Sequence, residues 1–193
     1  MYDGADTVVL YEELAFQDVL PIAWRPLATP WERDLAASFD ERNLRLLQAW
    51  DAMEEHVPVE KQKAEDAPYA AEIMRLDLKI NLLLDLVGQL LAANRPRPPT
   101  APVRFNALGA MWHTTNRGTL PEAGEQGIVE IYLRDCMAEP LRLAGRVTSV
   151  TPDGHIKVKF LPMGEAVSDL IEKLAFRRHR RQIAGARQPR RGQ

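Results

Sequence analysis

The stretch IMRLDLKINLLLDLVGQLL, residues 73–91, determines how the rest of the chain is interpreted. Its apolar residues recur alternately three and four positions apart, which is the spacing of a helix that buries one face. The six positions of this seam are Ile73, Leu76, Ile80, Leu83, Val87 and Leu90. β-Branched residues at one core position and Leu at the other are typical of a coiled coil, so the pattern predicts a self-associating helix.

A leucine-rich helix can also form the core of its own domain, and the pattern alone leaves that alternative open. Six unbroken core positions exceed what one small domain needs on a single helix, and leaving them exposed in a monomer would create a large apolar patch. Leu84, Leu86 and Leu91 widen the seam at its C-terminal end. A widened seam buries more surface than a two-stranded coil can cover, which favours a homotetramer over a dimer.

The N-terminal side of this helix, residues 1–68, is predicted to hold an extended segment and a second helix. Residues 7–10 suit a short strand, and residues 20–31 contain three prolines and suit an extended segment. A helix is expected from near Trp31 to about His56, and the polar stretch 57–68 suits a linker.

The C-terminal side changes to a period of two. Residues 95–102 are Pro-rich and predict a stiff linker that ends the heptad helix of residues 69–94. Five strands are predicted, at residues 103–105, 110–114, 127–133, 141–150 and 155–161, with a tight turn at residues 151–154. A helix with an apolar stripe at Val167, Leu170, Ile171 and Leu174 follows. The predicted fold is α+β, with a helical N-terminal region, a small antiparallel barrel plus C-terminal helix over residues 103–187, and a basic tail at residues 188–193.

Charge is distributed unevenly along the 193 residues. The formal net charge is −2, yet residues 177–193 contain seven arginines and no acid, so residues 1–176 sum to −9. A basic end on an acidic body suggests contact with something anionic. It could be a solvated terminus, a nucleic-acid contact, or a contact for a dinucleotide or an acidic partner. Nucleic acid is the less favoured of these, because no exposed aromatic or reading helix accompanies the arginines.

Catalytic and metal-site patterns have little support in the sequence. Cys136 is the single cysteine and has no motif around it, and the four histidines lack ligand spacing. The first residues are acidic, unlike a secretory signal, and no apolar run is long enough to cross a bilayer. We therefore expect a cytoplasmic, non-enzymatic protein with no metal and no membrane insertion.

The order of elements from the long helix onward resembles a PilZ domain, a small barrel that bacteria use in cyclic di-GMP signalling. A long helix, a Pro-rich break, the barrel and the closing stretch FRRHRRQIA at residues 176–184 are together similar to the atypical, tetrameric branch of that family from xanthomonads. The resemblance covers roughly residues 70–187. It implies a regulatory role in second-messenger signalling through a protein partner.

The resemblance also implies where a dinucleotide would bind. PilZ domains use an Arg-x-x-x-Arg stretch before the first strand and an Asp-x-Ser-x-x-Gly stretch on the first hairpin. Residues 104–109 align with the second motif, and only Gly109 matches, since Arg104 replaces the acid and Asn106 the serine. No Arg-x-x-x-Arg precedes the first strand, although Arg177/Arg181, Arg142/Arg146 and Arg187/Arg191 have that spacing elsewhere.

The functional expectation is therefore a non-catalytic adaptor that oligomerises through the seam and binds cyclic di-GMP weakly or not at all. One rival is a genuine cyclic di-GMP receptor, and a second is a nucleic-acid-binding protein that uses the tail. Candidate anion or dinucleotide contacts are Arg177, Arg178, Arg180, Arg181 and Gly109.

Overall fold

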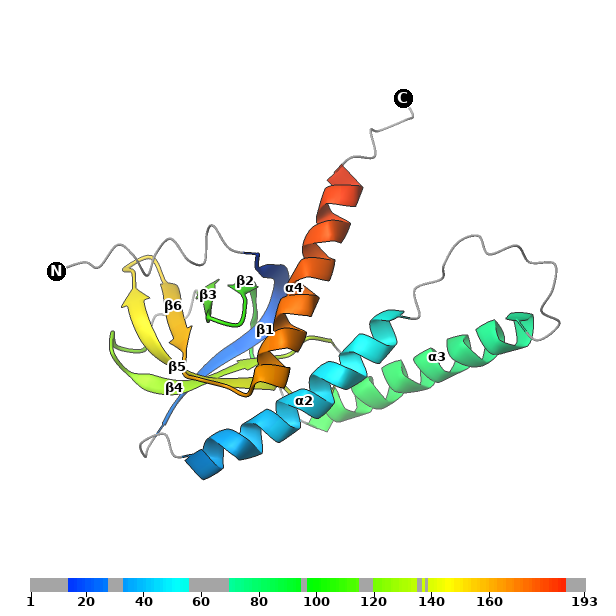
Figure 1. The fold of residues 1–193 in the computed structure, drawn as a ribbon, viewed down its shortest axis with the longest axis horizontal. Coiled ribbons are helices and arrows are strands. Elements are labelled where there is room, and N and C mark those ends of the chain that lie inside the picture. The colour runs from blue at the N-terminus through cyan, green and yellow to red at the C-terminus, as the bar shows by residue number, and fades with distance from the viewer. Residues whose placement is uncertain are drawn as a thin grey trace.

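In the residues that the computed structural model describes, the chain forms a six-stranded closed barrel and three long helices (Figure 1). The structure describes residues 14–27, 33–55, 70–94, 97–114, 120–134, 137 and 139–186. The elements in chain order are β1 (Phe16–Pro26), α2 (Arg33–Glu55), α3 (Ala70–Asn94), β2 (Thr100–Phe105), β3 (Gly109–His113), β4 (Gln126–Ile131), β5 (Leu141–Val150), β6 (His155–Phe160) and α4 (Glu165–Ala186).

All neighbouring strands in the barrel are antiparallel, in the order β1-β2-β3-β6-β5-β4. Alternate side chains point inward along each strand, as in β6, where Ile156, Val158 and Phe160 are buried. The turn into β6 requires Gly154, whose φ is +100° and whose added Cβ would lie 2.3 Å from the Thr114 carbonyl oxygen. The predicted turn at residues 151–154 is confirmed.

The barrel has one strand more than the five predicted from the sequence. The added strand is β1, which lies in the region assigned to the N-terminal extended segment, so the predicted barrel boundary at residue 103 is wrong for this strand. β1 pairs with β2 through residues 16–21 and with β4 through residues 22–26. Pro21 and Pro26 each stand at the last position of one pairing segment, so the strand accommodates residues that a central strand excludes.

The other predicted elements lie close to their expected bounds. β2 begins at Thr100, inside the predicted linker of residues 95–102, and β4 ends two residues earlier than expected. The short strand expected at residues 7–10 and the basic tail at residues 188–193 lie outside the described residues.

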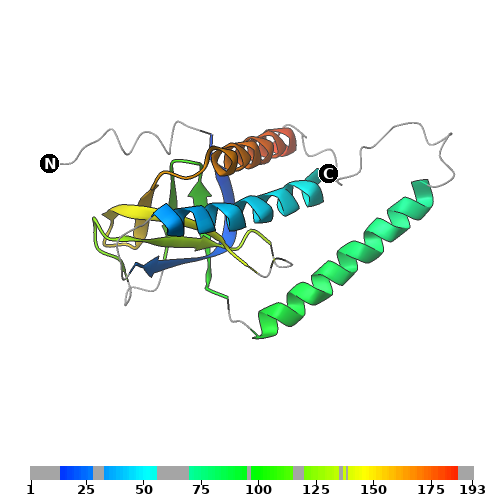
Figure 2. The same ribbon diagram turned by 60° about the horizontal axis from the view of Figure 1, so that its bottom comes forward.

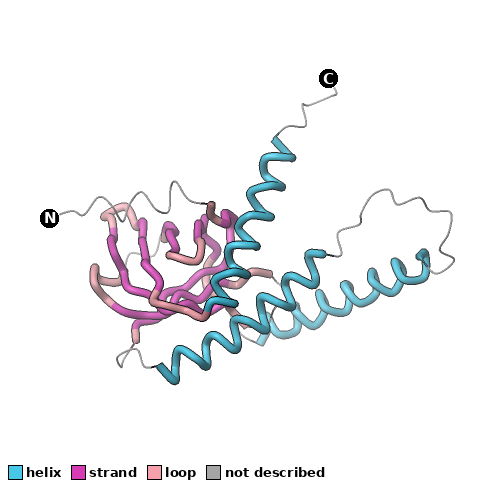
Figure 3. The backbone as a smooth tube through the Cα atoms, viewed as in Figure 1, coloured by secondary structure: helices cyan, strands magenta, loops and turns pink. Residues whose placement is uncertain are grey.

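Two helices cover one side of the barrel, as Figure 3 shows in cyan against the magenta strands. α4 buries Val167, Ile171 and Ala175 against the barrel, and α2 adds Leu47 and Trp50 to the same core. The Phe16 ring meets the Trp50 ring edge to face, with the ring centres 6.1 Å apart. It also lies tilted against the Phe105 ring, with the ring centres 5.1 Å apart. The core is therefore shared between the barrel and these two helices.

The third helix, α3, lies apart from this core. Figure 2, which views the chain from a different side, shows α3, in green, apart from α2 and from the barrel. No other described element packs extensively against it. α3 is joined to the barrel by a short connection to β2.

No helix in the described residues is long and apolar enough to span a membrane.

Candidate functional site

The first candidate region is the arginine-rich end of α4. Arg177 forms an ion pair with Asp51 of α2, and Lys173 Nζ lies 2.8 Å from the other oxygen of the same carboxylate. The side chains of Asp51 and Arg177 are 24% and 28% exposed, so this pair is partly shielded from water. These contacts hold α4 against α2.

Arg178 makes a similar attachment to β1. Its Nη2 donates to Asp18 Oδ2 at 2.6 Å, and its guanidinium lies 5.6 Å from the centre of the Phe16 ring. An anionic ligand at Arg177 or Arg178 would have to compete with a carboxylate that is already in contact. Two of the four arginines that were predicted to contact an anion are thus already paired with carboxylates of the fold.

The other two predicted arginines lie further along α4. The Arg180 guanidinium lies 5.8 Å from the centre of the half-exposed Phe176 ring, and Arg181 is exposed. Three of these side chains point to different places: Arg177 reaches α2, Arg178 reaches β1, and Arg180 lies over its own helix.

The second candidate region is the β2–β3 turn, where the sequence resembles a PilZ motif. Asn106 is 3% exposed, and its Oδ1 accepts hydrogen bonds from the main-chain nitrogens of Leu108 at 2.9 Å and Gly109 at 3.1 Å. The main-chain nitrogen of Asn106 in turn donates to the Gly109 carbonyl oxygen at 3.0 Å. Asn106 therefore stabilises the turn by side-chain capping. The acidic side chain of Glu172, on α4, lines the groove beside this turn, and none of the four arginines does.

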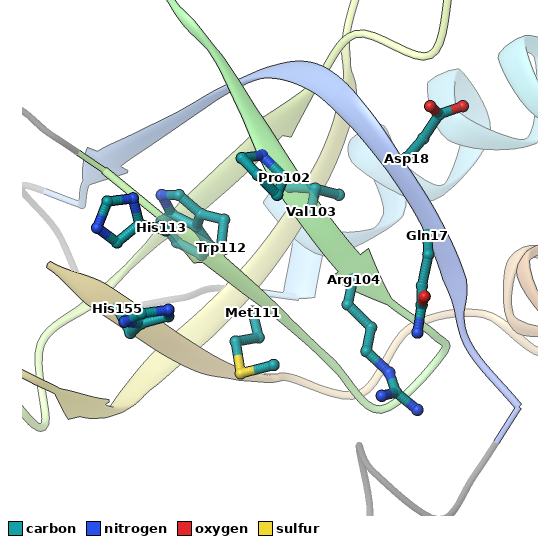
Figure 4. Close-up of a pocket in the computed structure, with 9 residues that line it drawn as sticks. All are labelled: Gln17, Asp18, Pro102, Val103, Arg104, Met111, Trp112, His113 and His155. Carbon is teal, nitrogen blue, oxygen red and sulfur yellow. The ribbon is translucent and has the colours of Figure 1, made fainter.

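A third region is an open pocket of about 590 Å³ on the outer wall of β1, β2, β3 and β6 (Figure 4). Arg104, Met111, His113 and His155 come from three adjacent strands and line it. Figure 4 shows Gln17 and Asp18 at the opposite end from the two imidazoles. This volume falls within the ~300–1,000 Å³ of small-molecule sites, although the pocket is open rather than enclosed.

The two imidazoles of this pocket are held by the β5–β6 turn. The ring centres lie 4.8 Å apart, and His113 Nε2 donates to the Asp153 carbonyl at 2.9 Å. His155 Nδ1 lies 2.7 Å from Asp153 Oδ2. The hydrogen bond from Thr151, followed by that from His155, lowers the pKa of Asp153 below its ordinary value. Asp153 thus has a turn-stabilising role.

Within the described residues, no group of three His, Cys, Asp or Glu side chains could hold a metal ion.

The fourth region is the apolar face of α3. All six seam residues are 49–67% exposed: Ile73, Leu76, Ile80, Leu83, Val87 and Leu90. Among the flanking residues Leu86 is also exposed, whereas Leu84 is half-buried and the side chain of Leu91 lies outside the described set. A soluble chain seldom leaves so many large apolar side chains on one helix in water.

Gln17 and Asp18 belong to these regions but were not identified from the sequence. Both lie at the start of β1, ahead of the extended segment predicted at residues 20–31. The buried alternate positions Leu20 and Ile22 were the available signal, and the prolines obscured it.

Comparison with known proteins identifies a matching family and a similar solved structure. Residues 44–188 match the family model described as "Atypical PilZ domain, cyclic di-GMP receptor". The chain is also similar to a solved structure of a pathogenic protein from Xanthomonas campestris, with 25% identity and a TM-score of 0.69, over 94% of this chain and 96% of that one. That protein is described as a tetrameric PilZ domain self-assembled via an unusual helical bundle. A search of curated proteins finds no match.

Proposed function

The chain belongs to the atypical PilZ domain family, and from that premise we propose that it is a non-catalytic adaptor in cyclic di-GMP signalling that self-assembles through α3. The observation that carries this proposal is the uncovered apolar face of α3. In this proposal residues 69–94 form the assembly helix, and the barrel with α4 forms the unit that is presented to a signalling partner.

Self-assembly accounts for a seam whose six residues remain largely exposed in the described chain. Leu76, Leu83 and Leu90 repeat every seven residues, and the positions between them are Ile or Val, so copies of α3 can pack knobs into holes. The exposed Leu86 widens the face, which favours a tetramer. The Xanthomonas relative, described as assembling through a helical bundle, supports the same interpretation.

Weak or absent dinucleotide binding is the second part of the proposal. The motif turn retains Gly109 alone of the family's pattern, and its Asn106 Oδ1 is already used by two main-chain nitrogens. Arg177 and Arg178 are ion-paired within the fold. A dinucleotide phosphate would therefore gain little at these positions.

The main alternative is a genuine cyclic di-GMP receptor, which the description of the family as a receptor favours. In that case Arg180 and Arg181, or Arg104 in the outer pocket, would supply the charge. A nucleic-acid-binding role for the basic end is the second alternative, and it predicts affinity that falls steeply with salt.

The mass of the full-length chain in solution tests the assembly. We expect an oligomer that Leu83→Asp dissociates while the barrel stays folded, because a charge cannot be buried in an apolar seam without a partner. Leu78→Asp is the matched control, since Leu78 is 71% exposed and lies about 140° around the helix from Leu83. A monomeric wild type, or equal dissociation by both variants, would refute the proposed assembly.

Calorimetry with cyclic di-GMP tests the adaptor hypothesis against the receptor hypothesis. We expect no binding in the micromolar range for the wild type. Micromolar binding that is lost in the double variant Arg180→Ala/Arg181→Ala would establish the receptor alternative. Arg177 and Arg178 are unsuitable for this test, because their substitution would also detach α4 from Asp51 and Asp18.

A further inference from the structure

The outer wall of β2, β3, β6 and β5 carries a cluster of positive charge. Along β6 the buried residues alternate with Lys157 and Lys159, which therefore point outward. Arg104 on β2 and Arg146 on β5 each stand between two buried neighbours and point outward as well. We call Arg104, Arg146, Lys157 and Lys159 the basic wall.

The strand register brings these four cations close together. Lys159 stands directly opposite Arg146, and Met111 on β3 stands directly opposite both Lys157 and Arg104, one on each side. Side chains that are directly opposite on antiparallel strands have their Cβ atoms about 4.5–5.5 Å apart, and like charges in such a pair are destabilising. The arrangement therefore favours an anionic group bound over the basic wall.

This cluster contrasts with the charge of the chain around it. Residues 1–176 sum to −9, so the basic wall is a local reversal of sign on an acidic body. The carboxylates of Asp18 and Asp153 lie near its margins and already bond to Arg178 and His155. Oppositely charged surfaces select their partners by this kind of complementarity.

The shape of the surface favours an extended polypeptide over a small molecule. Arg104 and Met111 also line the open pocket of about 590 Å³ in Figure 4, together with Pro102 and Val103. Sites for small molecules bury about 70–90% of the ligand surface, which an open trough along adjacent strands does not do. An acidic, extended stretch of chain suits both its charge and its shape.

The chain contains such a stretch in residues 1–13, MYDGADTVVLYEE, which lie outside the described residues. This segment has four acidic residues and no Lys or Arg. It joins the fold beside the basic wall, because Gln17 near the start of β1 stands directly opposite Arg104.

The tether is long enough to reach the whole basic wall. Three strand spacings, about 14 Å, separate β1 from β6 in the barrel order β1-β2-β3-β6. Asp6 stands ten residues before Phe16, which corresponds to about 33 Å of fully extended chain. A short tether also gives the segment an effective concentration on the order of millimolar, so even a weak contact is populated.

We propose that residues 1–13 bind across the basic wall of their own chain. The carboxylates of Asp3, Asp6, Glu12 and Glu13 pair with the four cations, and the segment covers the outer pocket. An anionic ligand, including a dinucleotide at Arg104, has to displace the segment before it reaches the wall. The inference does not depend on assembly through α3 or on the adaptor function.

Cross-linking of the full-length chain with a carbodiimide tests this proposal, because the reagent joins a carboxylate to an amine only where the two are in contact. Mass spectrometry of the digested protein should show links from the acidic residues of the segment to Lys157 and Lys159. Lys79 is the matched reference, since it is exposed on α3 and lies apart from the barrel. Links to Lys79 as frequent as those to Lys157 and Lys159 would overturn the proposal, as would the absence of links.

Charge reversal separates attraction from mere proximity. Arg146→Glu keeps both reactive lysines and should abolish the links, and so should about 1 M salt, where the Debye length is about 3 Å. Arg45→Glu is the control, because it makes the same change of charge at an exposed position on α2 and should leave the links intact. Thermal unfolding identifies a variant that fails to fold, and the salt dependence then decides the question. Links that survive both changes would refute the pairing.

The assembly-deficient Leu83→Asp variant shows which chain supplies the segment. The links should persist in its monomer, because the segment and the basic wall belong to the same chain. Links that disappear with the oligomer would show that the segment comes from a neighbouring copy, contrary to the proposal. A wild type that is monomeric and cross-linked would refute assembly through α3 and leave the contact of residues 1–13 established, whereas an oligomer without links would do the reverse.

Discussion

Two helices of this chain, α3 and α4, have the same kind of apolar stripe and use it differently. In α4, Val167, Ile171 and Leu174 are 8% exposed or less, because the stripe packs on the barrel. In α3, Ile73 and Leu83 are 64% and 61% exposed. Apolar periodicity therefore indicates that a helix has a face to bury, and it does not indicate which partner covers that face.

The helices also differ in how polar contacts accompany the stripe. α4 adds ion pairs from Lys173 and Arg177 to α2 and from Arg178 to β1. No ion pair is seen between the described residues of α3 and the rest of the described chain. α4 is thus part of the folded unit by both apolar and charged contacts, whereas no other described element packs extensively against α3.

The largest expected effect is on the α4 side of the comparison. Ile171→Ala should lower the free energy of unfolding by about 2–5 kcal/mol, because it leaves a cavity in the core shared by α4 and the barrel. Urea titration followed by tryptophan fluorescence measures this loss. Leu78→Ala on α3 is the matched control and should change the stability of the barrel by less than about 0.5 kcal/mol. Similar losses for both variants would show that α3 belongs to the same folded unit.

The next largest effect is that of protein concentration, which should affect the assembly through α3 and not the core that contains α4. If α3 is covered by other copies in a tetramer, each tenfold dilution weakens the assembly by about 4 kcal/mol per tetramer, or about 1 kcal/mol per chain, and lowers its melting temperature. The barrel transition should not move, because its core lies within one chain. Calorimetric scans over a concentration series measure both transitions. An assembly-deficient Leu83→Asp variant should retain only the concentration-independent transition.

A smaller effect is expected from the charged attachment of α4. Asp51→Asn should cost about 1 kcal/mol, since it removes the ion pairs of this carboxylate with Arg177 and Lys173, and the Asp51 and Arg177 side chains are only partly exposed. The shift in urea midpoint at low and high salt measures it. Glu41→Gln is the control, because the Glu41–Arg45 pair is exposed on both sides and should contribute little. An equal shift in both variants would mean that the shielding of Asp51 has no energetic consequence.

The smallest effect concerns acid. The pKa of Asp153 is lower in the folded chain than in the unfolded one, so its charged form stabilises the fold above about pH 4 and this contribution disappears as the pH falls through the folded value. Asp153→Asn should therefore flatten the acid limb of the barrel's pH–stability curve slightly. The oligomeric mass should stay the same, because Asp153 lies on the barrel. A change in mass would link the two regions that the comparison separates.

The sequence predicted the elements whose pattern is local. The alternation of Ile156, Val158 and Phe160, the glycine turn at Gly154 and the stripes of α3 and α4 are periodic over short windows, and the structure confirms the strands, the turn and the helices. β1 was missed as a strand because its pairing depends on residues far along the chain, and because its prolines, each at the last position of one pairing segment, obscured the pattern.

The candidate site was harder to predict for the same reason. The arginines of α4 were identified by their charge, but the carboxylates of Asp18 and Asp51 that pair with Arg178 and Arg177 are remote in sequence. Likewise, the spacing at residues 104–109 indicated the motif turn, whereas the contribution of Glu172 to its groove depends on the packing of α4. Charge and spacing can be identified in the sequence, while their neighbours follow from the tertiary fold.

The placement of β1 has a consequence for how the chain folds. Residues 27–99 separate β1 from β2, its first neighbour in the barrel, so this strand is synthesised long before either of its partners. Closing a loop of that length is slow, although lengthening it further adds only about 0.6 kcal/mol for each doubling. Helices have local contacts and form early, so α2 and α3 emerge from the ribosome as a helical insertion inside an unfinished sheet. The length of this insertion can therefore vary between relatives at little thermodynamic cost, while the sealing of the barrel waits for the C-terminal half of the chain.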